Sequence, residues 1–350
     1  PEFSQLPEDI SGEKNRKHRE KLARYLIQRR RGDILVSENE ESDFPTRVTS
    51  ECRYKLSANW DSLLDDTLDY CRGLVADVDE NTYGGKLMWW TALALLKSVS
   101  SSPQAASETF RKRASKELTV PAGLLSGDET SSDELDLLGE DLVVDADNSD
   151  INPDTDFEEC NREQIKQSEK KILLDLATKA EGLRGLQDDP KLAAVFEQVT
   201  RLLKAGQNPI IFCRFIATSK YVAEEIRKAF TPAELKKLKL KEVKIVQIDG
   251  NTSHEERELK IRDQLNSDYA EDSGVDTVAK VGNRILVCTD CLSEGVNIQD
   301  LFSSVIHYDL AWNPTRHEQR EGRVDRFGQV SVQVSCVTVV GDNHPVDGII

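Results

Sequence analysis

From about residue 160 onward, short apolar runs alternate with segments of helical periodicity. Runs that are apolar almost throughout are typical of strands buried on both faces of a sheet. Alternation of such strands with helices predicts an α/β fold with a parallel sheet flanked by helices. Ligands of such sheets gather at the carboxyl ends of the strands. The expected strands are 209–213, 243–248, 284–288, 305–308 and 332–340, and the expected helices are 162–181, 190–205, 218–230, 253–265 and 314–327.

The first part of the chain has a different pattern. Residues 14–31 hold nine Lys and Arg against one Glu, with Leu22, Tyr25 and Leu26 at helical spacing, which indicates a basic amphipathic helix. Its charged face is either simply solvated or a brace that faces phosphates. An extended segment is expected over 47–56 and helices over 59–78 and 85–116, with a break at Tyr83-Gly84-Gly85.

Residues 124–159 are acidic, rich in serine and poor in aromatic residues, a composition typical of a mobile loop. Between Asp128 and Glu159 there are fourteen Asp and Glu and no Lys or Arg. The chain carries a net charge of −17, and without this stretch the remainder would carry −3. The acidity is therefore local and does not exclude a nucleic-acid partner.

Cysteine usage and hydropathy indicate the compartment. Seven cysteines at irregular spacing argue against a disulfide framework and favour a reducing cytoplasm. The C-x-x-C of Cys288 and Cys291 lacks a second ligand pair, so no metal site is expected. The longest apolar run, 87–96, is about half of what crosses a bilayer, and the first residues show no secretory pattern. We expect a cytoplasmic protein without a membrane segment, and a fragment, since Pro1 is not an initiator Met.

Residues 313–329 hold the densest candidate chemistry. Asn313 is a good helix N-cap and Pro314 suits the first helical position. Gln319, Arg323 and Arg326 would lie on one face of the expected helix. Two guanidiniums on one face repel each other unless a multiply charged anion, such as a nucleoside triphosphate, lies opposite. The alternative is a surface helix neutralised by its own acidic residues, Glu318, Glu321 and Asp325.

Residues 289–299 follow an expected strand directly. Hydroxyls and free backbone N–H groups at the start of a short helix make an anion site. Thr289 and Ser293 could hold a nucleic-acid phosphate, while Glu294 and Gly295 turn toward a nucleotide. An ordinary strand-to-helix turn is the alternative. No phosphate loop of the form G-x-x-x-x-G-K-[ST] occurs in the chain, so the acidic run 133–136 has no such loop before it.

Together, these segments resemble the last signature motifs of superfamily 2 helicases and translocases. Asp309 to Pro314 (DLAWNP), followed by 319–329 (QREGRVDRFGQ), is similar to the Swi/Snf branch and closest to its bacterial RapA-like members. Residues 289–299 resemble the penultimate motif of that family. Phe212 to Phe215 with Thr218, and Asp249-Gly250 with Arg257, resemble the opening motifs of its second lobe. Arg320 departs from the pattern, because many Swi/Snf-type proteins carry Ala there.

The resemblance implies the C-terminal RecA-like lobe of a motor that binds ATP with Mg²⁺ between two lobes. A first lobe, in the same full-length chain, would bring the phosphate loop and the magnesium carboxylates, and this lobe would bring arginine fingers. The implied catalytic residues are Arg323, Arg326 and Gln319. The implied nucleotide-binding residues are Glu294, Gly295, Asn297 and Arg320. The implied nucleic-acid contacts are Phe215, Thr218, Thr289 and Ser293.

The predicted domains are therefore 1–50, a basic brace helix and linker to the first lobe; 51–123, a helical insert; 124–159, the acidic loop; and 160–350, the RecA-like lobe. The predicted function is one half of an ATP-dependent translocase on nucleic acid, duplex DNA before RNA. A strand-separating helicase lobe and a binding module without turnover are the alternatives. Without the phosphate loop, the isolated chain is expected to be inactive.

Overall fold

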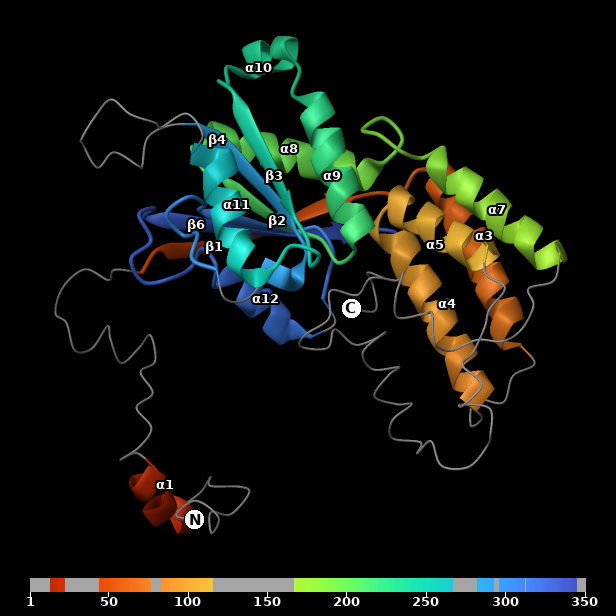
Figure 1. The fold of residues 1–350 in the computed structure, drawn as a ribbon, viewed down its shortest axis with the longest axis horizontal. Helices are drawn as coiled ribbons and strands as arrows, with labels where there is room; N and C mark the ends of the chain where they lie inside the picture. Colours follow the sequence, from red (N-terminus) through yellow and green to blue (C-terminus); the bar gives the residue numbers. More distant parts are fainter. Residues whose placement is uncertain are drawn as a thin grey trace. The chain divides into compact units, whose positions relative to one another are not determined.

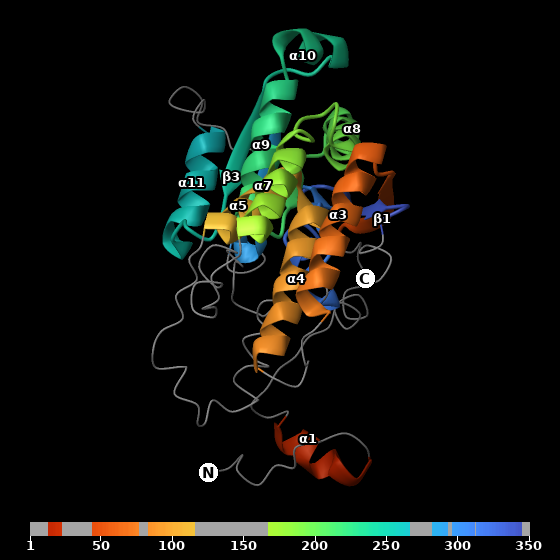
Figure 2. The same ribbon diagram turned by 90° about the vertical axis from the view of Figure 1, so that its right-hand side faces the viewer.

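The computed structural model describes residues 13–22, 44–76, 83–115, 167–266, 282–292, 296–311 and 313–344. The chain divides into two compact units, Pro1–Asp43 and Phe44–Ile350. In the first unit, the 3-10 helix η1 (Glu13–Asn15) leads into the basic helix α1 (Arg16–Leu22). All other described elements belong to the second unit (Figures 1 and 2).

One parallel sheet organises the second unit (Figure 1). In the described part of the chain its order is β1-β6-β5-β2-β4-β3. After β2 the chain adds β3 and β4 on one side, then crosses to add β5 and β6 on the other. This reversal beside β2 is a topological switch point, where open α/β sheets bind ligands. The strands are β1 (Thr46–Tyr54), β2 (Pro209–Phe212), β3 (Val243–Ile248), β4 (Asn283–Cys288), β5 (Ser304–His307) and β6 (Gln333–Gly341).

Helices cover both faces of the sheet, as the alternation of strands and helices predicts. On one face α8 (Pro190–Lys204) and α9 (Ile216–Ala229) pack on strand residues such as Ile211. On the other face α11 (His254–Asn266) packs on neighbours such as Ile210. Successive strand residues point to opposite faces, so each apolar strand serves both cores. The predicted RecA-like parallel sheet flanked by helices is confirmed.

A separate helical core forms the predicted insert. Figures 1 and 2 show α3 (Ala58–Val75), α4 (Tyr83–Ser101), α5 (Pro103–Ser115) and α7 (Gln167–Glu181) side by side. Their apolar faces meet around side chains such as Phe110, which is fully buried. Helix α7 lies in the segment 160–350 that the sequence assigns to the RecA-like lobe, yet it packs on the insert.

The extended segment predicted over 47–56 is a strand of the sheet. β1 pairs in parallel with β6, with Cys52 opposite Val339. The predicted boundary between residues 50 and 51 therefore falls inside β1. The helical insert is thus flanked in sequence by strands of one sheet.

Three local predictions differ from the structure. The helix predicted over 314–327 is α12 (Pro314–Glu321), which ends at Gly322, and the chain then continues through tight turns to Arg326. A Cβ at Gly322 would lie 3.2 Å from the carbonyl oxygen of Glu318, so a glycine fits this close approach. The expected break at Gly84-Gly85 lies inside α4. Helix α10 (Pro232–Leu238) has no counterpart in the sequence-based expectation, because so short a helix shows little periodicity.

Some predicted features lie outside the described residues. These are the arginine run 29–31, the acidic loop 124–159 and the site residues Ser293, Glu294 and Gly295. Within the described ranges, no helix is both long enough and apolar enough to span a membrane.

Candidate nucleotide and nucleic-acid site

The candidate site lies at the switch point, where the carboxyl ends of β2, β4 and β5 meet. Arg214 follows β2, Thr289 and Asp290 follow β4, and Asp309 follows β5. The backbone N–H of Arg214 donates to Asp309 Oδ2 at 2.8 Å, which joins the loops after β2 and β5. This is the edge that the sequence pattern marks for ligands.

Arg320 of α12 is locked into this edge by the 3-10 turn η2 (Asp290–Leu292). Its guanidinium donates two hydrogen bonds to the Asp290 carboxylate, at 2.6 and 2.7 Å, and a third to the carbonyl oxygen of Asp309 at 2.9 Å. Burial would raise the pKa of Asp290, but the Arg320 charge holds it below its usual value. Arg320 is 1% exposed, so its guanidinium fixes α12 against the sheet. This arrangement favours a structural role over the nucleotide contact that the resemblance implied.

Asp309 is the hub of a buried polar network that reaches the helical insert. Lys191 Nζ of α8 lies 2.8 Å from Asp309 Oδ1 and 4.4 Å from the centre of the Tyr308 ring. Ser101 Oγ, at the end of α4, donates to Asp309 Oδ2 at 2.8 Å. The Lys191 ammonium also donates to the carbonyl oxygen of Ser100 at 3.0 Å. The corner between α4 and α5 is therefore tied to the loops that close the candidate site.

The three implied catalytic residues do not share a helical face, because α12 ends before two of them. Gln319 lies on α12 and is half-buried. Arg323 is half-buried and donates from Nη1 to the carbonyl oxygen of Val296 at 2.9 Å. Arg326 is exposed. The hydrogen bond to Val296 brings Arg323 beside Asn297, an implied nucleotide-binding residue, which is also exposed.

The implied nucleic-acid contacts are mostly enclosed. Thr218 is fully buried, with its Oγ1 within 2.7 Å of Ser101 Oγ and 2.8 Å of Ser102 Oγ. Phe215 is 3% exposed, and the Arg214 guanidinium lies over its ring, 5.8 Å from the ring centre. Thr289 is buried too, and no described residue hydrogen-bonds its hydroxyl. In this arrangement the helical insert, rather than a phosphate, meets the Thr218 hydroxyl.

Two arginines of α11 hold the segment that follows β4. Arg257 Nη1 donates to the carbonyl oxygen of Cys291 at 2.6 Å. Arg262 Nη2 donates to the carbonyl oxygen of Asn297 at 2.8 Å, and its Nη1 lies 2.9 Å from Asp300 Oδ2. Arg257 and Arg262 thus tie α11 to the segment that follows β4.

A histidine pair joins the end of β5 to α12. The His307 and His317 rings lie 4.6 Å apart between centres, and His307 Nε2 lies 3.3 Å from Glu321 Oε1. Burial lowers the pKa of His307 to about 4. Arg47 of β1 reaches the same carboxylate, 2.6 Å from Glu321 Oε2. This cluster joins the edge strand β1 to the turn that carries Arg323.

The sequence did not predict which residues pair with the buried charged side chains of this site. Lys191 could have been noticed, because it lies among the apolar positions of α8 that form its buried face. Asp290 and Asp309 each follow a buried strand, which marks them only as loop residues. Nothing in the sequence pairs Arg320 with Asp290 or Lys191 with Asp309.

The parallel sheet, its switch point and the α12 segment define the fold class, a RecA-like lobe. Residues 191–328 match the family described as helicase conserved C-terminal domain. Residues 191–328 are therefore similar to helicase C-terminal domains, which supports the helicase C-terminal lobe that the motifs predict.

Two curated relatives and one solved structure illustrate the similarity. The uncharacterized ATP-dependent helicase YqhH of Bacillus subtilis is 48% identical over 46 residues, which are 13% of this chain and 8% of that protein. The ATP-dependent RNA helicase fal1 of Schizosaccharomyces pombe is 28% identical over 130 residues, 37% of this chain and 26% of that protein. The Sulfolobus solfataricus SWI2/SNF2 ATPase C-terminal domain has a TM-score of 0.44 and 14% identity, over 87% of this chain and 84% of that one. The chain spans 26% or less of the length of the curated relatives it matches.

Proposed function

We propose that this chain is the second motor lobe of an ATP-dependent nucleic-acid translocase of the Swi/Snf type. The observation that carries the proposal is the helicase C-terminal match over 191–328, a range that contains the half-buried Arg323 and the exposed Arg326. Duplex DNA is the proposed track and RNA the alternative. The closeness to RapA-like members stays a prediction from the sequence motifs.

In the proposed mechanism, ATP and Mg²⁺ bind mainly to a first RecA-like lobe. Among the described residues there is no group of three His, Cys, Asp or Glu side chains placed to hold a metal ion. When the lobes close, the exposed Arg326 reaches the terminal phosphate and Arg323 supports it from the Val296 side. A guanidinium that meets the developing charge of the transferred phosphoryl group accelerates turnover by roughly 10³–10⁵.

Arg320, Asp290 and Asp309 act as positioning residues in this proposal. Their buried contacts fix α12 and thereby the start of the turn that carries both arginines. The Lys191 and Ser101 contacts extend this rigidity to the helical insert. Because these contacts hold both arginines in place before the reaction, little free energy is needed to order them at the transition state.

The test is ATP hydrolysis by the full-length protein with duplex DNA, single-stranded DNA, RNA or no nucleic acid. We expect stimulation that is strongest with duplex DNA. Stimulation by RNA alone would select the RNA alternative. Absence of turnover under every condition would refute the motor assignment. The 350-residue chain alone should hydrolyse ATP at background rate, because its sequence contains no phosphate loop.

A further inference from the structure

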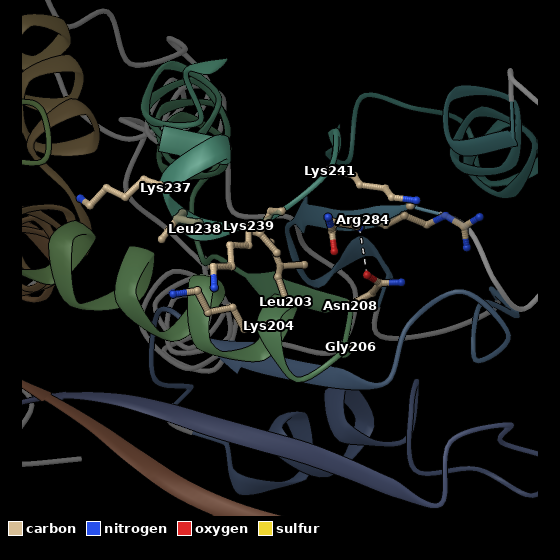
Figure 3. Close-up of a pocket in the computed structure, with 12 residues that line it drawn as sticks. Leu203, Lys204, Gly206, Asn208, Lys237, Leu238, Lys239, Lys241 and Arg284 are labelled. Carbon is tan, nitrogen blue, oxygen red and sulfur yellow. Dashed lines mark hydrogen bonds between the residues drawn. The ribbon is translucent and has the colours of Figure 1, made fainter. Parts of the chain in front are cut away.

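A basic pocket lies at the opposite edge of the sheet from the candidate site. It encloses about 800 Å³ at the amino ends of β2, β3 and β4 (Figure 3). Parallel strands all run the same way, so their amino ends are separated by the length of the strands from the loops that hold Asp290 and Asp309. The pocket is therefore distinct from the nucleotide edge.

The charge of this pocket has one sign. Its lining contains four lysines and one arginine and no acidic residue: Lys204, Lys237, Lys239, Lys241 and Arg284. Lys237 lies 3.2 Å from Glu234 of its own helix. For the other four, the described residues provide no carboxylate partner. The ends of α8 and α10 point into this region, and each helix end carries a partial negative charge of up to about half a unit. That offsets only a fraction of the lysine charge.

Arg284 is placed at a desolvation cost that no described contact of its Nε offsets. Arg284, at the start of β4, is 5% exposed, and no described residue hydrogen-bonds its Nε. Lys239 ends α10 in the left-handed conformation, with φ of 57°, and is the one such non-glycine among the described residues. Glycine adopts this conformation without the clash that a Cβ causes, so a lysine there sacrifices stability. Its backbone N–H caps α10 by donating to the carbonyl oxygens of Leu235 and Lys236.

We propose that this pocket binds the phosphate backbone of a nucleic acid, as a second contact outside the track at the carboxyl edge. The inference rests on the proposed function, since its ligand is the polymer on which the motor moves. Pockets of this size for drug-like molecules are mostly apolar, whereas this lining is dominated by ammonium and guanidinium groups. Lys204, at the end of α8, and Lys239 and Lys241, in the link between α10 and β3, are all exposed, which suits a row of phosphates along a strand better than a single ion.

The test compares two triple variants of the 350-residue chain in binding to fluorescently labelled duplex DNA over a range of salt concentrations. The pocket variant carries Lys204→Gln, Lys239→Gly and Lys241→Gln. The control carries Lys55→Gln, Lys170→Gln and Lys171→Gln, which remove the same charge from exposed positions outside the pocket. We expect the pocket variant to bind roughly tenfold more weakly, with a salt slope shallower by about two to three. The control should stay within about twofold, and both should melt like the parent.

Equal losses in the two variants would overturn the proposal, because the effect would then be one of net charge. Weakened binding of inorganic tripolyphosphate with unchanged duplex affinity would also overturn it, in favour of a small anion. The proposed function is tested separately by stimulation of ATP hydrolysis in the full-length parent. If duplex DNA stimulates ATP hydrolysis by the full-length parent but the pocket variant binds duplex DNA as tightly as the parent chain, only the pocket proposal is refuted.

Discussion

The two edges of the sheet treat positive charge in opposite ways. At the carboxyl edge, the buried cations Arg320 and Lys191 each meet a carboxylate at hydrogen-bonding distance. At the amino edge, Lys204, Lys239 and Lys241 line a pocket that contains no carboxylate. The same residue types thus occupy sites with and without internal partners.

This difference distinguishes charged side chains that stabilise the fold from charged side chains that are available to a ligand. Removing a charge from water is costly, and a buried pair recovers that cost only with close geometry and further hydrogen bonds, as Arg320 has with Asp290 and Asp309. An exposed cation retains its hydration and can release counterions when a polyanion binds. Arg326 shares this exposure, which is why we assign it, rather than Arg320, to the incoming phosphate.

The largest expected effect tests that assignment. In the full-length protein, Arg326→Ala should lower ATP turnover by about a thousandfold or more while melting is unchanged, because the side chain is exposed. Arg323→Ala should lower turnover similarly and also reduce stability, since it donates to Val296. Steady-state kinetics with saturating duplex DNA, paired with thermal melting, measures both. Arg201→Ala, an exposed arginine on α8, is the control. Parent-like turnover in Arg326→Ala would remove the finger role.

The second prediction breaks the buried pair. Arg320→Met leaves Asp290 buried without its cation, so the free energy of unfolding should fall by roughly 3–5 kcal/mol. Adding Asp290→Leu should restore much of the loss, because the carboxylate that lost its partner is then removed as well. Urea denaturation of the 350-residue chain measures these changes.

The matched control for this pair is the exposed ion pair of Arg111 with Glu181, which has the same fork geometry. Glu181→Gln should leave stability almost unchanged, since solvent screens an exposed pair. If Arg320→Met were equally harmless, the distinction between the two classes of charge would fail.

The third prediction concerns pH. Burial holds the pKa of His307 near 4 in the folded state, against an ordinary value of 6.5. Between these values the unfolded chain takes up a proton that the folded chain does not, so stability should fall as pH decreases from about 6.5 to about 4. The slope contributed by this group is roughly 1.4 kcal/mol per pH unit. His307→Gln should flatten this part of the stability profile, whereas His18→Gln, in the N-terminal unit, should not. An unchanged slope in His307→Gln would contradict the assignment.

The smallest expected effect concerns the stability of the amino edge of the sheet. Lys239→Gly should leave the unfolding free energy unchanged or raise it by up to about 1 kcal/mol, since glycine relieves the left-handed strain. Lys236→Gly, inside the same helix, should lower it by about 1 kcal/mol. Chemical denaturation of both variants decides the sign. A clear loss in Lys239→Gly would mean that this lysine stabilises the fold, which would weaken its place in the proposed pocket.

Much of the local structure could be predicted from the amino-acid sequence. The apolar runs predict the strands, because burial on both faces requires continuous apolar residues. Asn313 caps α12 through a hydrogen bond from the Thr315 N–H, with Pro314 in its first turn, as the sequence predicts. The end of that helix was not readable, because Gly322 and Arg323 adopt their turn while the neighbouring Val324 packs into the core on the α11 face of the sheet.

The amino-acid sequence by itself therefore determined the parallel α/β lobe and the helices of the insert, which depend on periodicity and short-range caps, whereas the motif segments were found by their resemblance to a known family. Only the tertiary structure decided which charges are compensated. Arg320 meets Asp290 across 30 residues, and Lys191 meets Asp309 across 118. It also placed Thr218 against Ser101 and Ser102 of the insert, where the motif alone suggested a phosphate. Electrostatic pairing depends on distance in space and on solvent exclusion, and neither is encoded in the spacing of residues along the chain.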